Sequence, residues 1–194
     1  PESSFNSFGY PNRVSVIGGG RWGRVIIQVL SEIAPQSTLL SLYSSHNFLF
    51  NKSWLHDQNL SARVELVQGP PIFDLETSNI AIIANAAQDH ETAVTKTLLA
   101  GVPTLVEKPF TLSTTASQRL IRLATQTRTR LSAAHVFTFA RYIQRLASFI
   151  PSPTDIKSIH VDWADPQNER RHGQDKSFDS SLPIVSDLLP HIVS

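Results

Sequence analysis

The chain has 194 residues, of which 41% are hydrophobic and 17% are charged, and its formal net charge is +1. This balance is ordinary for a packed globular protein, and the length suits one full domain, or one domain and part of another. So small a net charge gives no reason to expect a nucleic acid or a membrane surface as partner. The absence of cysteine excludes disulfides and thiolate metal ligands, and we predict no metal site.

No stretch of the sequence is typical of export or of insertion into a membrane. Its apolar runs fall far short of the roughly 20 residues that cross a bilayer, and the polar N-terminus lacks the pattern of a signal peptide. We therefore expect a cytoplasmic protein. Because methionine is absent, even at position 1, we expect that the initiator has been removed or that the chain is a fragment.

Short apolar strands alternate with amphipathic helices after a polar lead-in of residues 1–12. Strands are predicted at residues 13–17, 38–43, 63–67, 79–84, 104–106 and 131–137. Apolar residues at helical spacing predict helices at residues 22–33, within 47–62, at 90–100 and from Ser113 or Thr115 onwards. Such regular alternation indicates an α/β fold with a Rossmann doubly wound parallel sheet.

Two of these helices carry more detailed predictions. In the helix within residues 47–62, the side chains expected to face the core are those of Leu49, Phe50, Trp54 and Leu55. The next helix is predicted to begin at a cap formed by Asp89, since an aspartate side chain can accept from the free N–H groups of a first turn.

The pattern changes after residue 137. Residues 143–150 predict one more helix, alternation over residues 159–163 predicts a strand with one solvated face, and residues 165–181 are polar and typical of an exposed loop. These elements cannot form a core alone. We therefore predict a first, Rossmann domain at residues 1–137 and, at residues 138–194, the incomplete start of a second α+β domain with a mainly antiparallel sheet.

Gly18, Gly20 and Gly23 follow the first predicted strand and open the first predicted helix, the context in which a Gly-x-Gly-x-x-Gly pattern indicates dinucleotide binding. The first glycine permits a tight turn, the second lets the backbone approach a pyrophosphate, and the third permits close helix–strand packing. Arg21 and Trp22, inside this loop, join the predicted nucleotide-binding residues, although Trp22 is equally well placed to be core. In the alternative interpretation the glycines serve only a tight turn.

The end of the second predicted strand lacks the acid that would hold the ribose 2′-hydroxyl of NAD. Ser44, Ser45, His46 and Asn47 are neutral hydrogen-bonding groups that could accept a 2′-phosphate, with Lys52 or an arginine nearby. We therefore predict NADP or NAD as cofactor, with NADP favoured, and Ser44 and Ser45 among the cofactor-binding residues. The alternative is that these residues merely form a turn.

Residues 104–110 read TLVEKPF. Proline cannot donate to a sheet ladder, so the strand must stop before Pro109. Glu107 and Lys108 are thereby left at the carboxyl end of the strand, where open α/β sheets bind their ligands. The alternative is a solvated charge pair before a turn.

Asp187 and His191 lie four residues apart near the end of the chain and face the same way if they share one helix. Pro190 is tolerated in a helix only near its start, so the pair would lie at an N-terminal end. A histidine titrates near neutrality and suits proton transfer to or from a reacting hydroxyl. An acid and a histidine also lie four apart by chance in many sequences.

Together these stretches resemble the Gfo/Idh/MocA family of NAD(P)-dependent oxidoreductases. The similar segments are VSVIGGGRWGRV, IAIIANAAQDHETAVTKTLLAGVPTLVEKPF and SDLLPHIVS, in the order and spacing of the family. Two positions depart from the family pattern: Ala86-Ala87 stands in place of a proline, and Thr138-Phe139 in place of Arg-Phe. Both departures concern the substrate pocket.

The resemblance implies roles for the residues that match the family. Lys108 would reach the nicotinamide and the substrate, Glu107 would lie near the nicotinamide ribose, and the bond before Pro109 would be cis. Asn85 would line the cofactor channel. His90 matches a family histidine in the following helix, with capping or packing as its alternative role.

The resemblance also implies a catalytic group in which His191 is the general acid/base, Asp187 orients it or binds substrate, and Lys108 stabilises oxyanion charge. We therefore expect an enzyme that transfers a hydride between NAD(P)(H) and a hydroxyl, carbonyl or imine carbon of a small sugar-like or polyol substrate, and that is a homo-oligomer when full length. Two alternatives stay open: a non-catalytic dinucleotide-binding regulator of the same fold, and an NAD-dependent glycosidase or elimination enzyme that keeps its cofactor bound.

Overall fold

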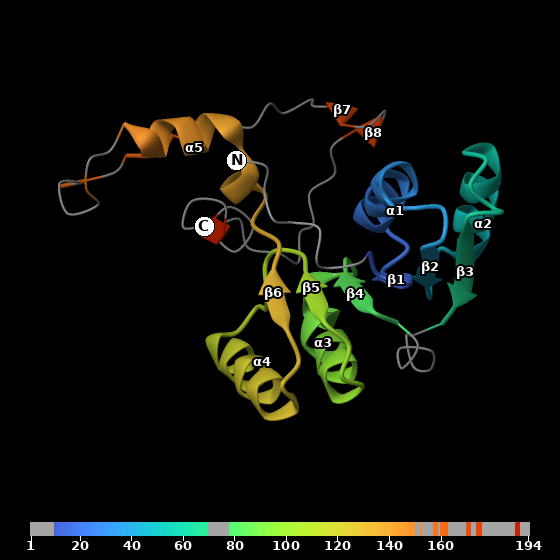
Figure 1. The fold of residues 1–194 in the computed structure, drawn as a ribbon, viewed down its shortest axis with the longest axis horizontal. Helices are drawn as coiled ribbons and strands as arrows, with labels where there is room; N and C mark the ends of the chain where they lie inside the picture. Colours follow the sequence, from blue (N-terminus) through green and yellow to red (C-terminus); the bar gives the residue numbers. More distant parts are fainter. Residues whose placement is uncertain are drawn as a thin grey trace. The chain divides into compact units, whose positions relative to one another are not determined.

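The structure, a computed structural model, contains two compact units. It describes residues 10–69, 78–149, 152, 157–158, 160–162, 170–171, 174–175 and 189–190. The first unit is Pro1–Ala134 and the second is His135–Ser194. Each unit is described by itself, with its elements labelled as in Figure 1.

A six-stranded sheet forms the centre of the first unit. Its strands pair in parallel in the order β3-β2-β1-β4-β5-β6. They are β1 Arg13–Ile17, β2 Leu39–Ser44, β3 Val64–Gln68, β4 Ile80–Ile83, β5 Thr104–Val106 and β6 Leu131–Ala133. The chain builds outward from β1 first on one side and then on the other, which is the doubly wound order. The predicted Rossmann sheet is confirmed.

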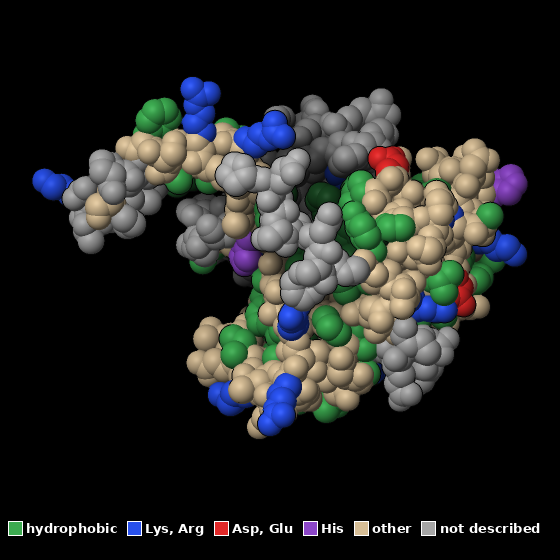
Figure 2. All heavy atoms as spheres, viewed as in Figure 1, with side chains coloured by type: hydrophobic (Ala, Val, Ile, Leu, Met, Phe, Trp, Pro, Cys, Tyr) green, Lys and Arg blue, Asp and Glu red, His purple; other side chains and the backbone are tan. Residues whose placement is uncertain are grey.

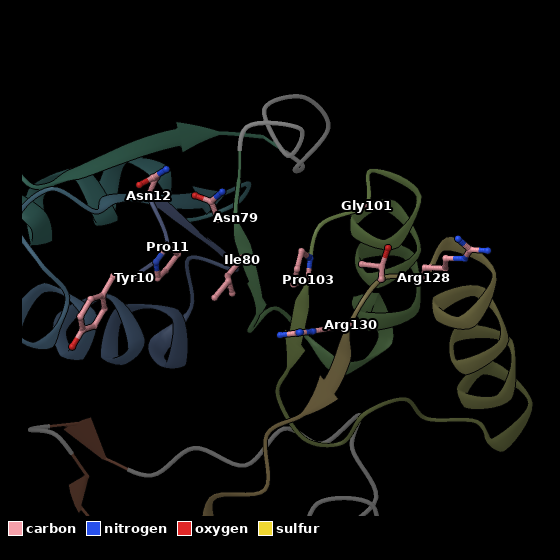
Figure 3. Close-up of a pocket in the computed structure, with 10 residues that line it drawn as sticks. Tyr10, Pro11, Asn12, Asn79, Ile80, Gly101, Pro103, Arg128 and Arg130 are labelled. Carbon is pink, nitrogen blue, oxygen red and sulfur yellow. The ribbon is translucent and has the colours of Figure 1, made fainter. Parts of the chain in front are cut away.

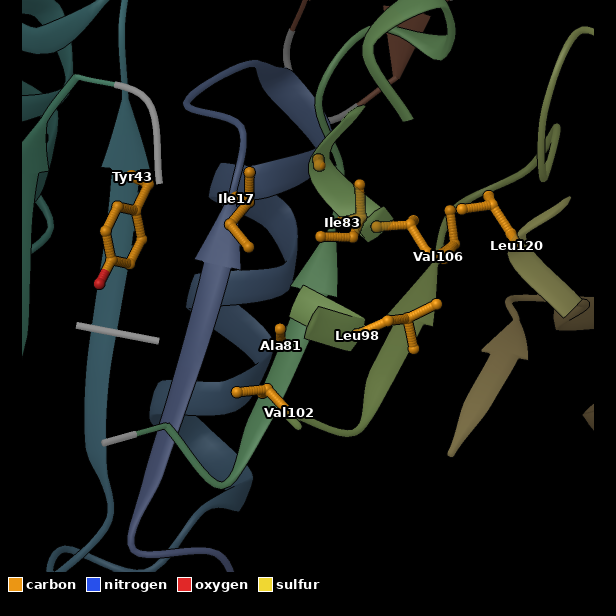
Figure 4. Close-up of a cluster of buried hydrophobic side chains, with 10 residues drawn as sticks. Ile17, Tyr43, Ala81, Ile83, Leu98, Val102, Val106 and Leu120 are labelled. Carbon is orange, nitrogen blue, oxygen red and sulfur yellow. The ribbon is translucent and has the colours of Figure 1, made fainter. Parts of the chain in front are cut away.

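Helices cover both faces of this sheet and bury an apolar cluster on each. They are α1 Arg21–Ile33, α2 Phe48–Asp57, α3 His90–Leu99 and α4 Thr114–Thr127, with the short 3-10 helix η3 Ala87–Asp89 before α3. Because side chains alternate across a strand, Val14 and Val16 of β1 pack with Ile27 of α1 and Leu55 of α2. Ile17 belongs to the opposite cluster, with residues of α3 and α4, which Figure 4 shows across the strands.

The last strand of the sheet is shorter than predicted. The strand predicted at residues 131–137 ends at Ala133, and Val136–Phe139 form the 3-10 helix η4 instead. The reason lies in its partner: among the described residues, β6 pairs with β5 alone, from Thr104 to Val106, residue for residue. Beyond the end of β5, the described part of the chain offers no strand with which β6 could continue to pair.

Helix α2 turns a different face to the core from the one predicted. Leu55 is buried and Trp54 packs against the same cluster, but Leu49 and Phe50 are 77% and 54% exposed. Asn51 takes the inward position one turn before Leu55 and is fully buried. At 3.6 residues per turn, positions 49 and 50 point about 120° or more away from position 55, so the prediction for these two residues was wrong.

The caps of α3 and α4 differ. Asp89 precedes α3, but its side chain makes no capping hydrogen bond, which corrects that prediction. Ser113, the first of the two predicted candidates, caps α4 by accepting from the backbone N–H of Ala116 at 3.4 Å.

The described part of the second unit has little regular structure. It contains η4, helix α5 Arg141–Ser148 and an antiparallel pair of β7 Arg170–Arg171 with β8 Gln174–Asp175. Of the strand predicted at residues 159–163, the described residues 160–162 have no regular secondary structure, and the two end residues lie outside the described part. The domain boundary after residue 137 and the nature of the second domain stay predictions.

The face drawn in Figure 2 carries scattered charged side chains, with no continuous patch of either sign. None of the described helices combines the length and the apolar character that a membrane crossing requires.

Candidate functional site

The glycine loop lies where the strand order reverses. It follows β1, which pairs with β2 on one side and β4 on the other, and open α/β sheets bind their ligands at the carboxyl ends of the strands at such a point. The N–H of Gly18 donates to the carbonyl of Tyr43 at 3.0 Å, and the N–H of Ala84 donates to that of Ile17 at 2.8 Å. The start of the loop is thereby tied to the end of β2, and the residue after β4 is tied to the end of β1.

Gly18 and Gly23 have no room for a side chain. Gly18 has a φ of +121°, and a Cβ there would lie 2.5 Å from the backbone nitrogen of Asn85. A Cβ on Gly23 would lie 1.8 Å from the carbonyl oxygen of Gly18. The first glycine therefore serves the tight turn, and the third lets α1 approach the loop closely, as the sequence pattern predicted.

Gly20 is different, because nothing lies within 4 Å of a Cβ built on it. It is the N-cap residue of α1, and no side chain caps the first turn of that helix. Free N–H groups and the positive end of the helix dipole favour an anion at this place. The loop therefore fits the pyrophosphate of a dinucleotide.

A buried contact that the sequence analysis missed ties the loop to α2. The Asn51 side-chain nitrogen donates to the carbonyl of Gly19 and to the Ser44 hydroxyl, both at 2.9 Å. A Cβ on Gly19 would lie 2.2 Å from the Ser44 oxygen, so Gly19 is also confined. Asn51 could have been found from the sequence, since it shares a helical face with Trp54 and Leu55.

The other predicted nucleotide-binding residues around the loop differ in exposure. Ser44 is 1% exposed and engaged with Asn51, whereas Ser45 is exposed. Trp22 is 48% exposed, so it is not a core residue. The Arg21 Nε is buried and has no hydrogen-bond partner within the described part of the chain.

The second part of the site begins where β5 ends, at Val106. The N–H of Glu107 donates to the carbonyl of Ile83 at 2.9 Å, and the Lys108–Pro109 bond is cis. Burial raises the pKa of the Glu107 carboxyl, against the opposing effects of the Lys108 N–H, the Lys108 charge and His90. The backbone N–H of Lys108 donates to the Glu107 carboxylate at 3.3 Å. Lys108 itself is partly buried.

His90 joins these two parts of the site. Its ring is 1% exposed, with Nδ1 at 2.9 Å from the carbonyl oxygen of Pro109 and Nε2 at 3.1 Å from that of Asn85. Both neighbours are backbone atoms, so the ring holds the turn after β5 beside the end of β4. The Asn85 Oδ1 is buried and, among the described residues, has no donor. It is an acceptor that a bound ligand can use.

Asp187 and His191 lie outside the described residues. Between them, Leu189 and Pro190 are helical, and the carbonyl oxygen of Pro190 lies 3.3 Å from Nδ1 of His135. Within the described ranges there is no group of three or more His, Asp or Glu residues that could hold a metal ion.

A cavity of about 560 Å³ lies at the opposite ends of the strands from the glycine loop (Figure 3). Its lining includes Asn12, Asn79, Pro103 and Arg130, which precede β1, β4, β5 and β6. It is therefore at the amino ends of the strands, and it is separate from the glycine loop.

The described site thus combines the glycine loop after β1 with an acid–lysine–proline turn after β5, and β4 lies between these two strands. A model of an oxidoreductase family with an NAD-binding Rossmann fold, Gfo/Idh/MocA, matches residues 12–135. The chain belongs to this family. The match covers the NAD-binding Rossmann fold of the Gfo/Idh/MocA family, and the matched residues contain all six strands of the sheet.

Solved structures share this Rossmann fold with the Gfo/Idh/MocA chain at low identity. UDP-N-acetylglucosamine 3-dehydrogenase from Acidithiobacillus ferrooxidans is 24% identical over 74% of this chain and 44% of its own, with a TM-score of 0.60. Biliverdin reductase from Synechocystis sp. PCC 6803, in complex with biliverdin and NADP+, is 17% identical over 71% of this chain and 42% of its own, with a TM-score of 0.57. GenD2 from gentamicin A biosynthesis, in complex with NAD, is 20% identical over 78% of this chain and 42% of its own, with a TM-score of 0.63.

The chain spans less than half the length of each of these three proteins. No curated protein matches its sequence significantly.

Proposed function

We propose that the glycine loop binds NADP(H) or NAD(H), and that the chain contributes this site to an enzyme that transfers a hydride to or from a sugar-like or polyol substrate. The observation that carries the proposal is the meeting of two segments at the end of β4. Gly18 packs on Asn85, and His90 ties Asn85 to the turn that contains Lys108. A dinucleotide whose pyrophosphate rests on the loop would extend its nicotinamide toward that turn.

Different residues of the site bind different parts of this cofactor. The backbone around Gly20 and the first turn of α1 bind the pyrophosphate, since this is the open, uncapped end of the helix. The unsatisfied Oδ1 of Asn85 accepts from a donor at the nicotinamide end. Trp22, half exposed beside the loop, covers the bound nucleotide.

When bound, the nicotinamide supplies or accepts the hydride at its C4. Lys108 provides the positive charge that stabilises the substrate oxygen as it becomes negative. The His191 ring takes the proton from a hydroxyl during oxidation and returns it during reduction, with Asp187 orienting the ring or binding the substrate. Glu107 holds the ribose of the nicotinamide.

The substrate class and the assembly belong to this proposal as well. Membership of the Gfo/Idh/MocA family and the fold shared with a nucleotide-sugar dehydrogenase support a sugar-like or polyol substrate. We propose a cytoplasmic homo-oligomer for the full-length enzyme.

Tryptophan fluorescence during titration with NADPH or NADH tests the nucleotide site. We expect saturable quenching, because Trp22 is half exposed beside the glycine loop. Trp22→Phe should lose most of the signal but still bind the nucleotide by calorimetry. If neither nucleotide binds to wild type by either method, the proposal is wrong.

A further inference from the structure

Two arginines occupy the first turn of α1, a place where cations are disfavoured. Arg21 and Arg24 lie three residues apart, on neighbouring positions of the helix surface. The first turn contains no acidic residue, and no carboxylate of the described residues forms an ion pair with either guanidinium. The positive end of the helix dipole repels both side chains. Such a pair is stabilised when an anion binds between or beside its members.

Arg24 is held in a defined orientation by two contacts. Its guanidinium carbon lies 4.8 Å from the centre of the Phe50 ring, on α2, within the range of a cation–π interaction. Its Nη1 donates to the carbonyl oxygen of Gly19 at 3.2 Å. The Phe50 side chain is 54% exposed and therefore not a core residue. Here it provides the surface on which the guanidinium lies.

The same contacts locate Arg24 at the end of β2. The Gly19 carbonyl that accepts from Arg24 also accepts from Asn51, and the Asn51 nitrogen donates to the Ser44 hydroxyl at 2.9 Å. Ser44 is the last residue of β2. In a Rossmann fold the adenosine ribose binds at this strand end, where an acid accepts the 2′-hydroxyl of NAD and an arginine accommodates the 2′-phosphate of NADP. Residues 44–47 contain no acid.

The surroundings of Arg24 disfavour its positive charge, and a bound anion would favour it. Burial and the neighbouring Arg21 lower the pKa of its guanidinium. A phosphate nearby would offset both effects, since it supplies the opposite charge and replaces lost water as a hydrogen-bond acceptor.

We propose that Arg24, lying on the Phe50 ring, binds the 2′-phosphate of NADP(H) and makes the site selective for NADP(H) over NAD(H). Arg21, nearer to the open Gly20, serves the pyrophosphate that both nucleotides share. The proposal rests on the proposed function, because it requires a dinucleotide at the glycine loop. A planar guanidinium on an aromatic ring suits a phosphate better than the flexible Lys52 ammonium.

Calorimetric titration of the whole chain with NADPH, NADH, 2′,5′-ADP and 5′-ADP tests this proposal. We expect wild type to bind each 2′-phosphorylated compound at least about tenfold more tightly than its partner, the effect of one charge-assisted contact. Arg24→Gln should remove most of this preference and leave NADH affinity within about twofold, since only the 2′-phosphate loses its ligand. Arg24→Lys and Phe50→Leu should remove part of it.

Two controls separate the site from general charge effects. Arg122→Gln removes one positive charge from an exposed position on α4, and both affinities should match wild type. Lys52→Gln should leave the preference intact. Circular dichroism establishes whether each variant is folded. If Arg24→Gln does not fold, the milder variants Arg24→Lys and Phe50→Leu still decide the test.

Three results would overturn the proposal. Equal affinity of wild type for NADPH and NADH would show that no 2′-phosphate site exists, while the proposed function would stand. Equal weakening of both nucleotides by Arg24→Gln would assign Arg24 to the pyrophosphate or to the loop itself. Failure of wild type to bind any of the four compounds would contradict the proposed function and this inference together.

Discussion

Gly18, Gly19 and Gly23 are each confined by a different neighbour. A side chain on Gly18 would meet the backbone after β4, one on Gly19 would meet Ser44 and Asn51, and one on Gly23 would meet Gly18 itself. Gly20 alone among these four faces open space. The residues that shape the loop can therefore be separated by mutation from the residue that leaves room for a ligand.

Alanine at Gly18 and at Gly20 should destabilise the protein to different extents. Gly18→Ala places a methyl against fixed backbone at a φ of +121°, so we expect a loss of about 2 kcal/mol or more in the free energy of unfolding. Gly20→Ala should cost at most about 1 kcal/mol, the difference between glycine and alanine at an N-cap. It should nevertheless weaken nucleotide binding, because the methyl enters the open space. Urea denaturation and calorimetry measure the two effects, and equal destabilisation by both variants would contradict this division.

Glu107 should make the stability of the protein fall with increasing pH. Because burial raises its pKa above the ordinary 4.5, the folded state binds the proton more tightly than the unfolded chain does. The stability that this group contributes is fully present below the unfolded-state pKa and is lost as the pH rises through the folded-state pKa. Glu107→Gln keeps the size of the side chain and an acceptor for the Lys108 N–H, but it cannot ionise.

Urea denaturation over a range from about pH 4 to about pH 8 checks this effect. We expect Glu107→Gln to gain stability relative to wild type as the pH rises, since it avoids ionisation in a buried place. Glu32→Gln, at an exposed position on α1, is the control and should follow wild type. If the profile of Glu107→Gln ran parallel to that of wild type, the carboxyl would have no part in the pH dependence.

At the scale of elements, α2 connects the sheet to the glycine loop. Leu55 anchors its inner face in the apolar cluster, while Asn51, one turn earlier, reaches Gly19 and Ser44. On its outer side Phe50 contacts Arg24 of α1. A single helix therefore positions the loop through a buried polar contact and positions a cation through an exposed aromatic ring.

Replacing Asn51 with leucine should destabilise both the fold and the nucleotide site. The isosteric Asn51→Leu removes two buried hydrogen bonds and leaves the Gly19 carbonyl with one donor fewer. We expect a loss of about 1–3 kcal/mol in the free energy of unfolding, together with weaker binding of NADPH. Ser53→Ala, at an exposed position on the same helix, should change neither. Wild-type affinity in a destabilised Asn51→Leu would show that the contact supports the fold alone.

At the scale of the whole molecule, the first unit contains the described residues to which we assign the nucleotide site. All six strands of the sheet, both apolar clusters and the glycine loop lie between residues 12 and 134. Helix α5 of the second unit has exposed side chains throughout. Both apolar clusters consist of residues of the first unit.

A fragment of residues 1–134 should therefore fold and bind nucleotide by itself. We expect one cooperative unfolding transition, because the fragment keeps a complete doubly wound sheet with helices on both faces. Its affinity for NADPH should match that of the whole chain within about twofold. Calorimetry and urea denaturation of the fragment and the whole chain provide the comparison. A non-cooperative transition, or loss of binding, would show that the second unit completes the site.

The elements of the first unit could be predicted because their signals are local. A parallel strand buried on both faces is a short apolar run, and a helix on such a sheet has apolar residues at a period near 3.6. The turn after β5 and the tight positions of Gly18 and Gly23 were also predicted, because proline restricts the backbone and glycine permits conformations and close approaches that a side chain would prevent. Both effects depend little on the rest of the chain. The glycine pattern and the missing acid after the second strand assigned the nucleotide-binding loops. The family resemblance assigned the roles of Asn85, Glu107, Lys108, Asp187 and His191, and these assignments are still to be tested.

Tertiary structure decided what depends on partners distant in the sequence. The short β5 limits β6, and Asn51 rather than Leu49 or Phe50 faces inward because Gly19 and Ser44 lie there to receive it. His90 joins the segments that follow β4 and β5 through its contacts with the carbonyl oxygens of Asn85 and Pro109. Neither segment's sequence predicts these contacts on its own. The sequence by itself determined the parallel sheet, the succession of strands and helices along the chain, and the glycine turn. The packing of side chains from separate segments determined which polar groups are buried and which of them have hydrogen-bond partners.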